Sequence, residues 1–170
     1  IGATTRAGLL SSPLRDRFGV THRMEYYSEE EITDIILRGG NILGVKIELD
    51  GAKELASRSR GTPRIANRLL KRVRDFCEIR GNGIIDRDIS LKALDILGID
   101  SAGLDDLDRD IVNAIIDNYG GGPVGIDTLS LMLGEDKRTL EEVYEPYLVK
   151  IGYLKRTNRG RMVNEDKHKS

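Results

Sequence analysis

The fold is decided by residues 60–74, Arg60-Gly61-Thr62-Pro63-Arg64-Ile65-Ala66-Asn67-Arg68-Leu69-Leu70-Lys71-Arg72-Val73-Arg74, which predict a helix whose first turn faces an anion. Thr62 suits the N-cap, and Pro63 suits the first helical position because its fixed φ is already helical. Arg64 then lies in the first turn. There the free backbone N–H groups and the positive end of the helix dipole point the same way as its guanidinium. The sequence therefore predicts a phosphate-facing helix start centred on Arg64.

One side of this helix is apolar at helical spacing, through Ile65, Ala66, Leu69, Leu70, Val73, Phe76 and Cys77. We expect this side to pack against other helices. The basic residues away from it, Arg68, Lys71, Arg72 and Arg74, are interpreted as solvated surface charges.

Length and composition indicate a soluble globular protein with one large domain or two to three small ones, at 170 residues, 39% hydrophobic and 32% charged. No apolar run approaches the roughly 18 residues that span a bilayer, and no signal-peptide pattern opens the chain. The single Cys77 excludes an internal disulfide, and His22 and His168 are too far apart in sequence to suggest zinc. Charge is uneven: the net charge is −9 over residues 98–149 and +5 over 150–170.

Residues 1–27 predict pieces of a larger domain. Ile1 to Thr5 are typical of the end of a buried strand, Ser12-Pro13 predicts a short helix closed by Gly19, and residues 20–27 predict a strand. Such strands need neighbours that 27 residues cannot supply. We therefore expect this segment to be the remnant of an upstream α/β domain.

Residues 28–100 predict a small helical domain. Ser28 and Glu31 have capping-box spacing, Gly39-Gly40 should weaken the middle of the helix that follows, and Gly44 should end it. Further helices are expected to start at Asp50, at Thr62 and at Asp86. Four amphipathic helices joined by short turns can bury one another.

Residues 101–163 predict three helices followed by a basic hairpin, which is the winged-helix plan. The third helix, from Asp136 to Ile151, should be kinked by Pro146 and should turn Val143 and Tyr144 inward. Two strands are expected around Asn158-Arg159-Gly160. The last residues, 164–170, are predicted to be a disordered tail.

The hairpin carries the predicted nucleic-acid chemistry. Lys155, Arg156, Arg159 and Arg161 crowd it without an acidic neighbour in the hairpin, which suits contact with the DNA backbone or minor groove, and Lys137 adds a weaker phosphate contact. The third helix is expected to present Glu141, Glu142 and Glu145 outward, which argues against its insertion into the major groove. No nucleophile, metal cluster or paired acid and base is evident. The acids Asp105, Asp106, Asp108 and Asp110 are interpreted as helix N-terminal residues.

Five motifs in order resemble the C-terminal half of the RuvB family, the AAA+ motors of Holliday-junction branch migration. They are Gly2-Ala3-Thr4-Thr5-Arg6, Ser12-Pro13-Leu14-Arg15-Asp16-Arg17-Phe18-Gly19, Gly61-Thr62-Pro63-Arg64, Glu145-Pro146-Tyr147-Leu148 and Arg159-Gly160-Arg161. The resemblance implies a mainly α fold with a small β component: a helical AAA+ lid domain, then a winged-helix domain, preceded by the remnant of the ATPase domain. Asn158 stands where the family more usually has proline.

The resemblance also implies residue roles. Thr5 takes the sensor 1 position, and Arg17, rather than Arg15, is the arginine finger that acts in trans. Arg64 is the sensor 2 arginine, and Tyr27 lies against the adenine. Arg156 and Arg161 of the wing are implicated in DNA binding.

By the same resemblance, the complete subunit is an ATP-dependent translocase or helicase. It would form a homo-hexamer on duplex DNA at four-way junctions, in the bacterial cytoplasm, with RuvA and possibly RuvC as partners. ATP is the implied cofactor, its Mg²⁺ held by an N-terminal part. This chain has neither a Gly-x-x-x-x-Gly-Lys-Ser/Thr loop nor a Walker B strand, so we expect it to be inactive alone.

Two other interpretations remain open on the residues. One is a winged-helix DNA-binding regulator with a helical interaction domain, in which Arg17 and Arg64 only form ion pairs. The other is a clamp-loader subunit of the same fold, although the wing is not expected there.

Overall fold

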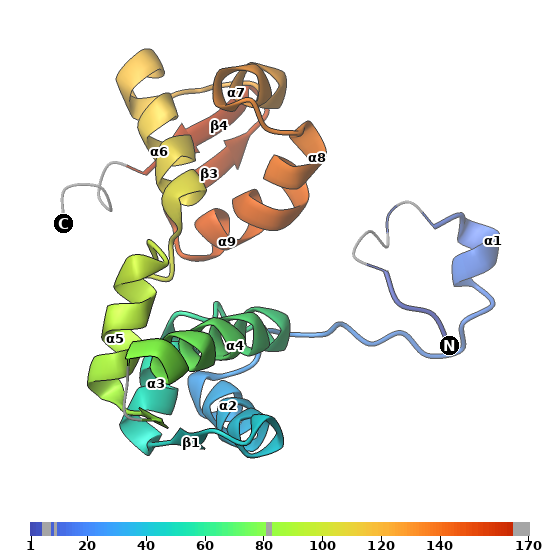
Figure 1. The fold of residues 1–170 in the computed structure, drawn as a ribbon. Coiled ribbons are helices and arrows are strands. Elements are labelled where there is room, and N and C mark those ends of the chain that lie inside the picture. Colours follow the sequence, from blue (N-terminus) through green and yellow to red (C-terminus); the bar gives the residue numbers. More distant parts are fainter. Residues whose placement is uncertain (5–7, 9, 81–82, 165–170) are drawn as a thin grey trace.

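The computed structural model describes residues 1–4, 8, 10–80 and 83–164, and it contains two helical domains in sequence (Figure 1). The first comprises α2 (Glu29–Leu43), β1 (Lys46–Ile47), α3 (Leu49–Ser57), α4 (Pro63–Arg80), β2 (Ile84–Ile85) and α5 (Arg87–Ile96). The second comprises α6 (Asp106–Tyr119), α7 (Ile126–Leu133), α8 (Lys137–Thr139), the π-helical η2 (Leu140–Tyr144), α9 (Glu145–Lys150), β3 (Leu154–Thr157) and β4 (Gly160–Val163). A short helix, α1 (Ser12–Arg15), precedes both. The mainly helical fold is the one that the sequence predicted.

The first domain buries the helix faces that the sequence identified. α2 begins with a capping box between Ser28 and Glu31 and ends at Gly44, which is left-handed, and Asp86 caps α5 by accepting from Ile89 N at 2.8 Å. The core joins all four helices and contains Ile32, Ile36, Ala52, Leu55, Ala56, Ala66, Leu69, Leu70, Val73, Cys77, Ile85, Ala93 and Leu94. Burial of this face holds α4, and with it Arg64, in a fixed position.

The glycine pair does not interrupt α2, which runs through both residues. A Cβ on Gly40 would lie 2.3 Å from Ile47 Cδ1, and one on Gly39 would lie 2.8 Å from Leu70 Cδ2. Close packing against β1 and α4 therefore offsets the low helix propensity of glycine here.

Two local features differ from expectation. α3 begins at Leu49 with Glu48 at the cap, so Asp50 lies in its first turn instead of capping it. The domain also contains a parallel pair of two-residue strands, with Lys46 opposite Ile84 and Ile47 opposite Ile85. This pair could not be predicted from the sequence because two residues are too few for an alternation to be visible.

The second domain packs three helical segments on a small sheet. A capping box between Asp105 and Asp108 starts α6, as the acidic run predicted, and left-handed Gly120 ends it. Its core contains Leu104, Ile111, Val112, Ile115, Val124, Ile126, Leu129, Leu140, Tyr147, Leu148, Leu154 and Val163. β3 and β4 pair antiparallel, and Val124 adds an isolated bridge to Arg161.

The third helix is divided where Pro146 requires it. η2 carries the chain from α8 into α9, and Glu145 N donates to Leu140 O, five residues back. The wider turn accommodates a proline that has no N–H to give. Val143 is exposed, so its predicted inward position is wrong, because the π turn rotates the following residues relative to an α-helix.

The predicted strand at residues 20–27 does not form, and Ile1 is fully exposed. An isolated strand has unsatisfied edges and is not stable without a partner strand, and the described residues provide none. α1 also ends earlier than expected, at Arg15. Figure 1 shows this segment extending away from the two domains. No described helix is both long and apolar enough to cross a bilayer.

Candidate nucleotide-sensing site and nucleic-acid interface

The start of α4 is open, as its sequence predicted. Arg64 is exposed, and no acidic side chain among the described residues pairs with it. Pro63 occupies the first helical position, and Thr62 O accepts from Ala66 N at 3.0 Å. The N–H groups of Arg64 and Ile65 have no helical acceptor by geometry, so they and the guanidinium are available to an anion.

The turn before α4 brings this helix start against the segment that enters the first domain. Arg60 and Gly61 are both left-handed, with φ of 57° and 67°. Tyr27 N donates to Gly61 O at 3.0 Å, and a Cβ on Gly61 would lie 2.8 Å from Tyr27 O. Glycine is therefore required at position 61 both by its φ and by this close approach.

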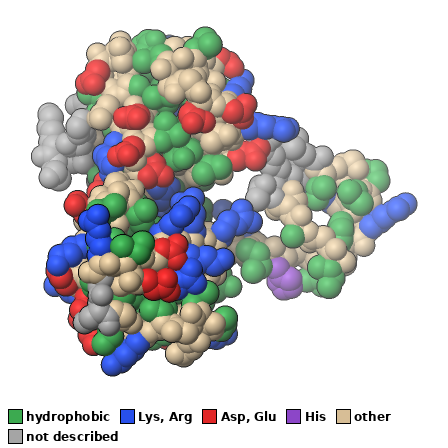
Figure 2. All heavy atoms as spheres, viewed as in Figure 1, with side chains coloured by type: hydrophobic (Ala, Val, Ile, Leu, Met, Phe, Trp, Pro, Cys, Tyr) green, Lys and Arg blue, Asp and Glu red, His purple; other side chains and the backbone are tan. Residues whose placement is uncertain are grey.

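A hollow of about 530 Å³ lies beside Tyr27. Residues 23–28 line it, together with Glu31 and Lys150, and the Lys150 ammonium lies 3.8 Å from the centre of the Tyr26 ring. Arg64 is not among the lining residues. Figure 2 shows Lys and Arg side chains over α4 on the face of the first domain in view, with Asp and Glu side chains among them.

Two further residues that were predicted to act on a nucleotide, Arg17 and Thr5, belong to the N-terminal segment. Arg17 follows α1 and is exposed, and Figure 1 shows α1 apart from α4, the helix that carries Arg64. Arg15 donates to Ser12 Oγ at 3.3 Å, so the two arginines of this segment differ in their surroundings. Thr5 lies outside the described residues.

The hairpin places two arginines directly opposite each other. Arg156 on β3 pairs with Arg161 on β4, and like charges in this arrangement repel. The adjacent helix provides the counter-charges. Arg156 lies 3.4 Å from Glu145 Oε1 and 3.6 Å from Glu141 Oε1, and its side chain is 63% exposed.

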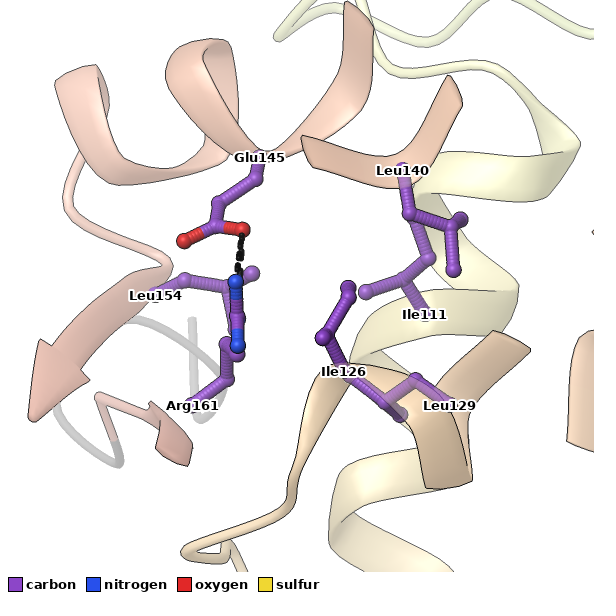
Figure 3. A pocket seen from close by; sticks show the side chains of 7 residues that line it. All are labelled: Ile111, Ile126, Leu129, Leu140, Glu145, Leu154 and Arg161. Carbon is purple, nitrogen blue, oxygen red and sulfur yellow. Dashed lines mark hydrogen bonds and ion pairs between the residues drawn. The ribbon is translucent and has the colours of Figure 1, made fainter. Parts of the chain in front are cut away.

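Arg161 is the buried member of this pair, with its side chain only 9% exposed. Its Nη2 donates to Glu145 Oε2 at 2.8 Å and to Glu141 Oε1 at 3.0 Å, and its Nε donates to Glu145 Oε2 at 3.1 Å. Figure 3 shows the two side chains meeting beside an apolar wall of Ile111, Ile126, Leu129 and Leu140. The expectation that Glu145 faces outward is wrong: it is buried because it neutralises Arg161.

The other basic residues of this surface differ in how free they are. Lys155 and Arg159 are exposed, and the turn between them is fixed because Thr157 Oγ1 accepts from Arg159 N at 3.2 Å. Lys137 lies 2.7 Å from Asp127 Oδ1, and this hydrogen bond raises the pKa of Lys137 and lowers that of Asp127. Arg159 and Lys155 are thus the most available cations of the wing.

The burial of Glu145 could not be predicted from the sequence. A glutamate close to two other acids is typical of a surface helix, and its burial depends on Arg161, sixteen residues later. No group of three or more His, Cys, Asp or Glu residues able to hold a metal occurs within the described part of the chain.

Comparisons with known proteins agree with these two domains. The RuvB AAA lid domain family matches residues 27–100, and the RuvB C-terminal winged helix domain family matches residues 101–168. The Holliday junction branch migration complex subunit RuvB of Fusobacterium nucleatum is 77% identical over 163 residues, covering 96% of this chain and 49% of that protein. Its counterpart in Parabacteroides distasonis is 59% identical, covering 97% of this chain and 48% of that protein.

A solved structure gives the same result. The Thermotoga maritima RuvB Holliday junction branch migration motor superposes with a TM-score of 0.92 at 51% identity, covering 99% of this chain and 56% of that one. The chain spans about half the length of the curated relatives it matches. The lid, the winged helix and the order in which they follow each other show that the chain belongs to the RuvB family.

Proposed function

We propose that this chain is the nucleotide-sensing and duplex-binding half of an ATP-driven branch-migration subunit. The RuvB relatives are named as subunits of the Holliday junction branch migration complex, and the solved relative is named as its motor. In the complete subunit, ATP hydrolysis drives movement of duplex DNA through a four-way junction during recombination and repair. The winged-helix regulator is not favoured, because a regulator has no need for the lid domain matched over residues 27–100.

The observation that carries the proposal is the exposed Arg64 at the start of α4, a helix whose apolar face is buried. A surface arginine without an acidic partner, fixed next to free N–H groups, is built for an anion from outside the chain. Tyr27 lines the hollow, and its N–H donates to Gly61 O in the turn that leads into α4, which supports a nucleotide position close to the start of this helix. Arg64 would hold the terminal phosphate as sensor 2, and Tyr27 would lie against the adenine. ATP supplies the phosphoryl group whose transfer to water releases the free energy, and its Mg²⁺ is held by the remainder of the subunit.

The ring assembly explains why Arg17 and Arg64 lie apart. In ring ATPases an arginine finger is supplied in trans, where it stabilises charge that develops on the transferred phosphoryl group. We assign this role to Arg17, acting on the neighbouring protomer of a homo-hexamer, and the sensor 1 role to Thr5. The junction-binding protein RuvA and the resolvase RuvC are the partners proposed for the ring, in the bacterial cytoplasm.

DNA binding is assigned to the wing. Arg159 and Arg156 are exposed and suited to phosphate contacts, with Lys137 adding a weaker one. Arg161 can contact DNA if its guanidinium leaves Glu141 and Glu145, and otherwise it holds the hairpin in place for Arg156.

The proposal is tested by Arg17→Ala in the complete subunit. ATP binding should be retained, because this guanidinium belongs to the neighbour's site, whereas turnover should fall by roughly a thousandfold or more. Arg15→Ala is the matched control, since Arg15 lies on the same segment and contacts Ser12. Full turnover by the Arg17 variant would defeat the assignment.

A further prediction concerns the 170-residue chain itself. It should hydrolyse no ATP but should bind duplex DNA weakly, with an affinity that falls as salt rises. Arg159→Ala should reduce the slope of log K against log salt by about 1, because one phosphate contact is lost. An unchanged slope for this variant, measured by fluorescence anisotropy, would remove Arg159 from the interface.

A further inference from the structure

The join between the two domains is held by side chains from both. Residues 100–103 connect α5 to the winged-helix domain and look like a simple polar linker in the sequence. Arg58 Nε donates to Asp100 O at 3.1 Å from the lid side, and Tyr147 Oη donates to Ala102 O at 2.7 Å from the winged-helix side. The Cα of Gly103 approaches so closely that an added Cβ would lie 3.0 Å from Arg58 O. The linker is therefore packed and cannot swing freely.

Arg60 is the centre of this join. Its Nε donates to Gly103 O at 2.9 Å, its Nη2 donates to Asp108 Oδ2, and its guanidinium carbon lies 4.6 Å from the centre of the Tyr147 ring. Its side chain is 10% exposed and that of Asp108 is fully buried. A single residue of the lid thus contacts the linker, α6 and α9. Figure 1 shows α9 on the side of the winged-helix domain that faces the lid, and one end of α6 reaching toward the lid.

The backbone of Arg60 is left-handed, and the contacts of its side chain hold it in this conformation. Among the described residues it is the one non-glycine residue with positive φ. A left-handed conformation is unfavourable for a residue with a side chain and persists where surrounding contacts enforce it. The fork to Gly103 and Asp108 provides those contacts, as a lysine could not.

The position of Arg60 links this join to the nucleotide side. Gly61 accepts from Tyr27 N, and α4 begins two residues later with Arg64 in its first turn. A second contact lies beside the first, because Lys150 of α9 reaches the Tyr26 ring. The winged-helix domain is therefore held against the turn that leads into α4, the helix whose start carries Arg64.

We propose that Arg60 is the positioning residue that fixes the winged-helix domain on the lid, so that both move as one body when the start of α4 moves. The second half of this statement rests on the proposed function; the first does not. Loss of the Arg60 charge leaves the Asp108 carboxylate buried without a cation, a state that is relieved when the domains separate and water enters. Removal of Arg60 should therefore loosen the join without unfolding either core.

The join is tested in the 170-residue chain by a distance measurement between spin labels. Asn41→Cys on α2 and Asn158→Cys on the wing provide exposed sites, whereas the native Cys77 is buried in the lid core. We expect a narrow distance distribution that becomes roughly twofold wider or more with Arg60→Met. Arg74→Met is the matched control, since Arg74 pairs with Asp75 and Glu78 inside α4, and it should leave the distribution unchanged.

An unchanged distribution for Arg60→Met would overturn the proposal. If this variant does not fold, Asp108→Asn provides the same test, because it removes the partner charge while retaining an acceptor for Asp105 N. In the complete subunit, Arg60→Met should keep ATP hydrolysis yet lower the branch migration obtained per ATP by about tenfold, an effect that a merely destabilised protein would not show. If the join loosens as expected but the unmodified complete subunit hydrolyses no ATP, the proposed function fails while the role of Arg60 in the join stands.

Discussion

At the scale of single residues, two buried ion pairs fix the geometry of the second domain and of the join: Arg161 with Glu145, and Arg60 with Asp108. Glu145 and Arg161 are each less than a tenth exposed, and both lie within the winged-helix domain. Glu145 Oε1 has no hydrogen-bond partner among the described residues and faces the guanidinium of Arg156 at 3.4 Å. Such pairs fix a geometry, and removing one partner costs more than the pair contributes.

Glu145→Gln should therefore destabilise the winged-helix domain by about 2–4 kcal/mol, because Arg161 keeps a buried charge with a weaker partner. Urea denaturation of the chain measures this. The double variant with Arg161→Met should recover most of the loss, since both charges are then absent. Equal stabilities of the wild type and the single variant would contradict the burial of this pair.

The pKa of Asp108 predicts how the free energy of unfolding changes with pH. Burial raises its pKa from 3.8 to about 6, against the lowering effects of the Asp105 N–H group and the Arg60 charge. Between these two values the folded chain holds a proton that the unfolded chain has released. The contribution of Asp108 to the free energy of unfolding thus falls as pH rises from about 4 to about 6, on the order of 1 kcal/mol per pH unit.

Asp108→Asn isolates this effect, because the amide does not titrate. The stability of the wild type minus that of the variant should decrease over this range and become constant above it. A difference that increases with pH would show that Arg60 lowers the pKa more than burial raises it.

At the scale of elements, the sequence predicted the helices wherever a cap and an apolar face coincide. α4 starts at Pro63 and buries the predicted face, and the predicted capping box of α2 forms. The β1–β2 pair and the π turn could not be predicted, because each depends on contacts distant in sequence. The exposed Arg64 followed from its position in the helix, whereas the roles of Arg60 and Glu145 depend on partners far along the chain.

α2 offers a test in which packing opposes helix propensity. Replacing a helical glycine with alanine ordinarily stabilises by about 1 kcal/mol. Gly40→Ala should instead destabilise the lid domain by about 1–3 kcal/mol, because the new methyl group would overlap Ile47. Asn41→Ala on the exposed face of the same helix is the control, and thermal unfolding distinguishes the two. A stabilised Gly40 variant would show that β1 is not packed as described.

At the scale of the whole molecule, the proposed function places nucleotide sensing in the first domain and DNA binding in the second. The turn before α4 contacts the segment that enters the lid, and the Arg60 join connects the two domains. Figure 1 shows the wing strands β3 and β4 between α6 and α8. Under the proposed function, a small movement at Arg64 would be carried to DNA by the two joined domains, as in other domain closures.

The most direct test of the account is the branch-migration rate of a complete subunit that carries Arg64→Ala. ATP should still bind through the remainder of the subunit, while hydrolysis and branch migration should both fall by about tenfold to a thousandfold, since one preorganised cation is lost. Arg68→Ala, one turn further along α4 and also exposed, should leave both rates unchanged. A wild-type branch-migration rate in the Arg64 variant would contradict the claim that this helix start senses the nucleotide.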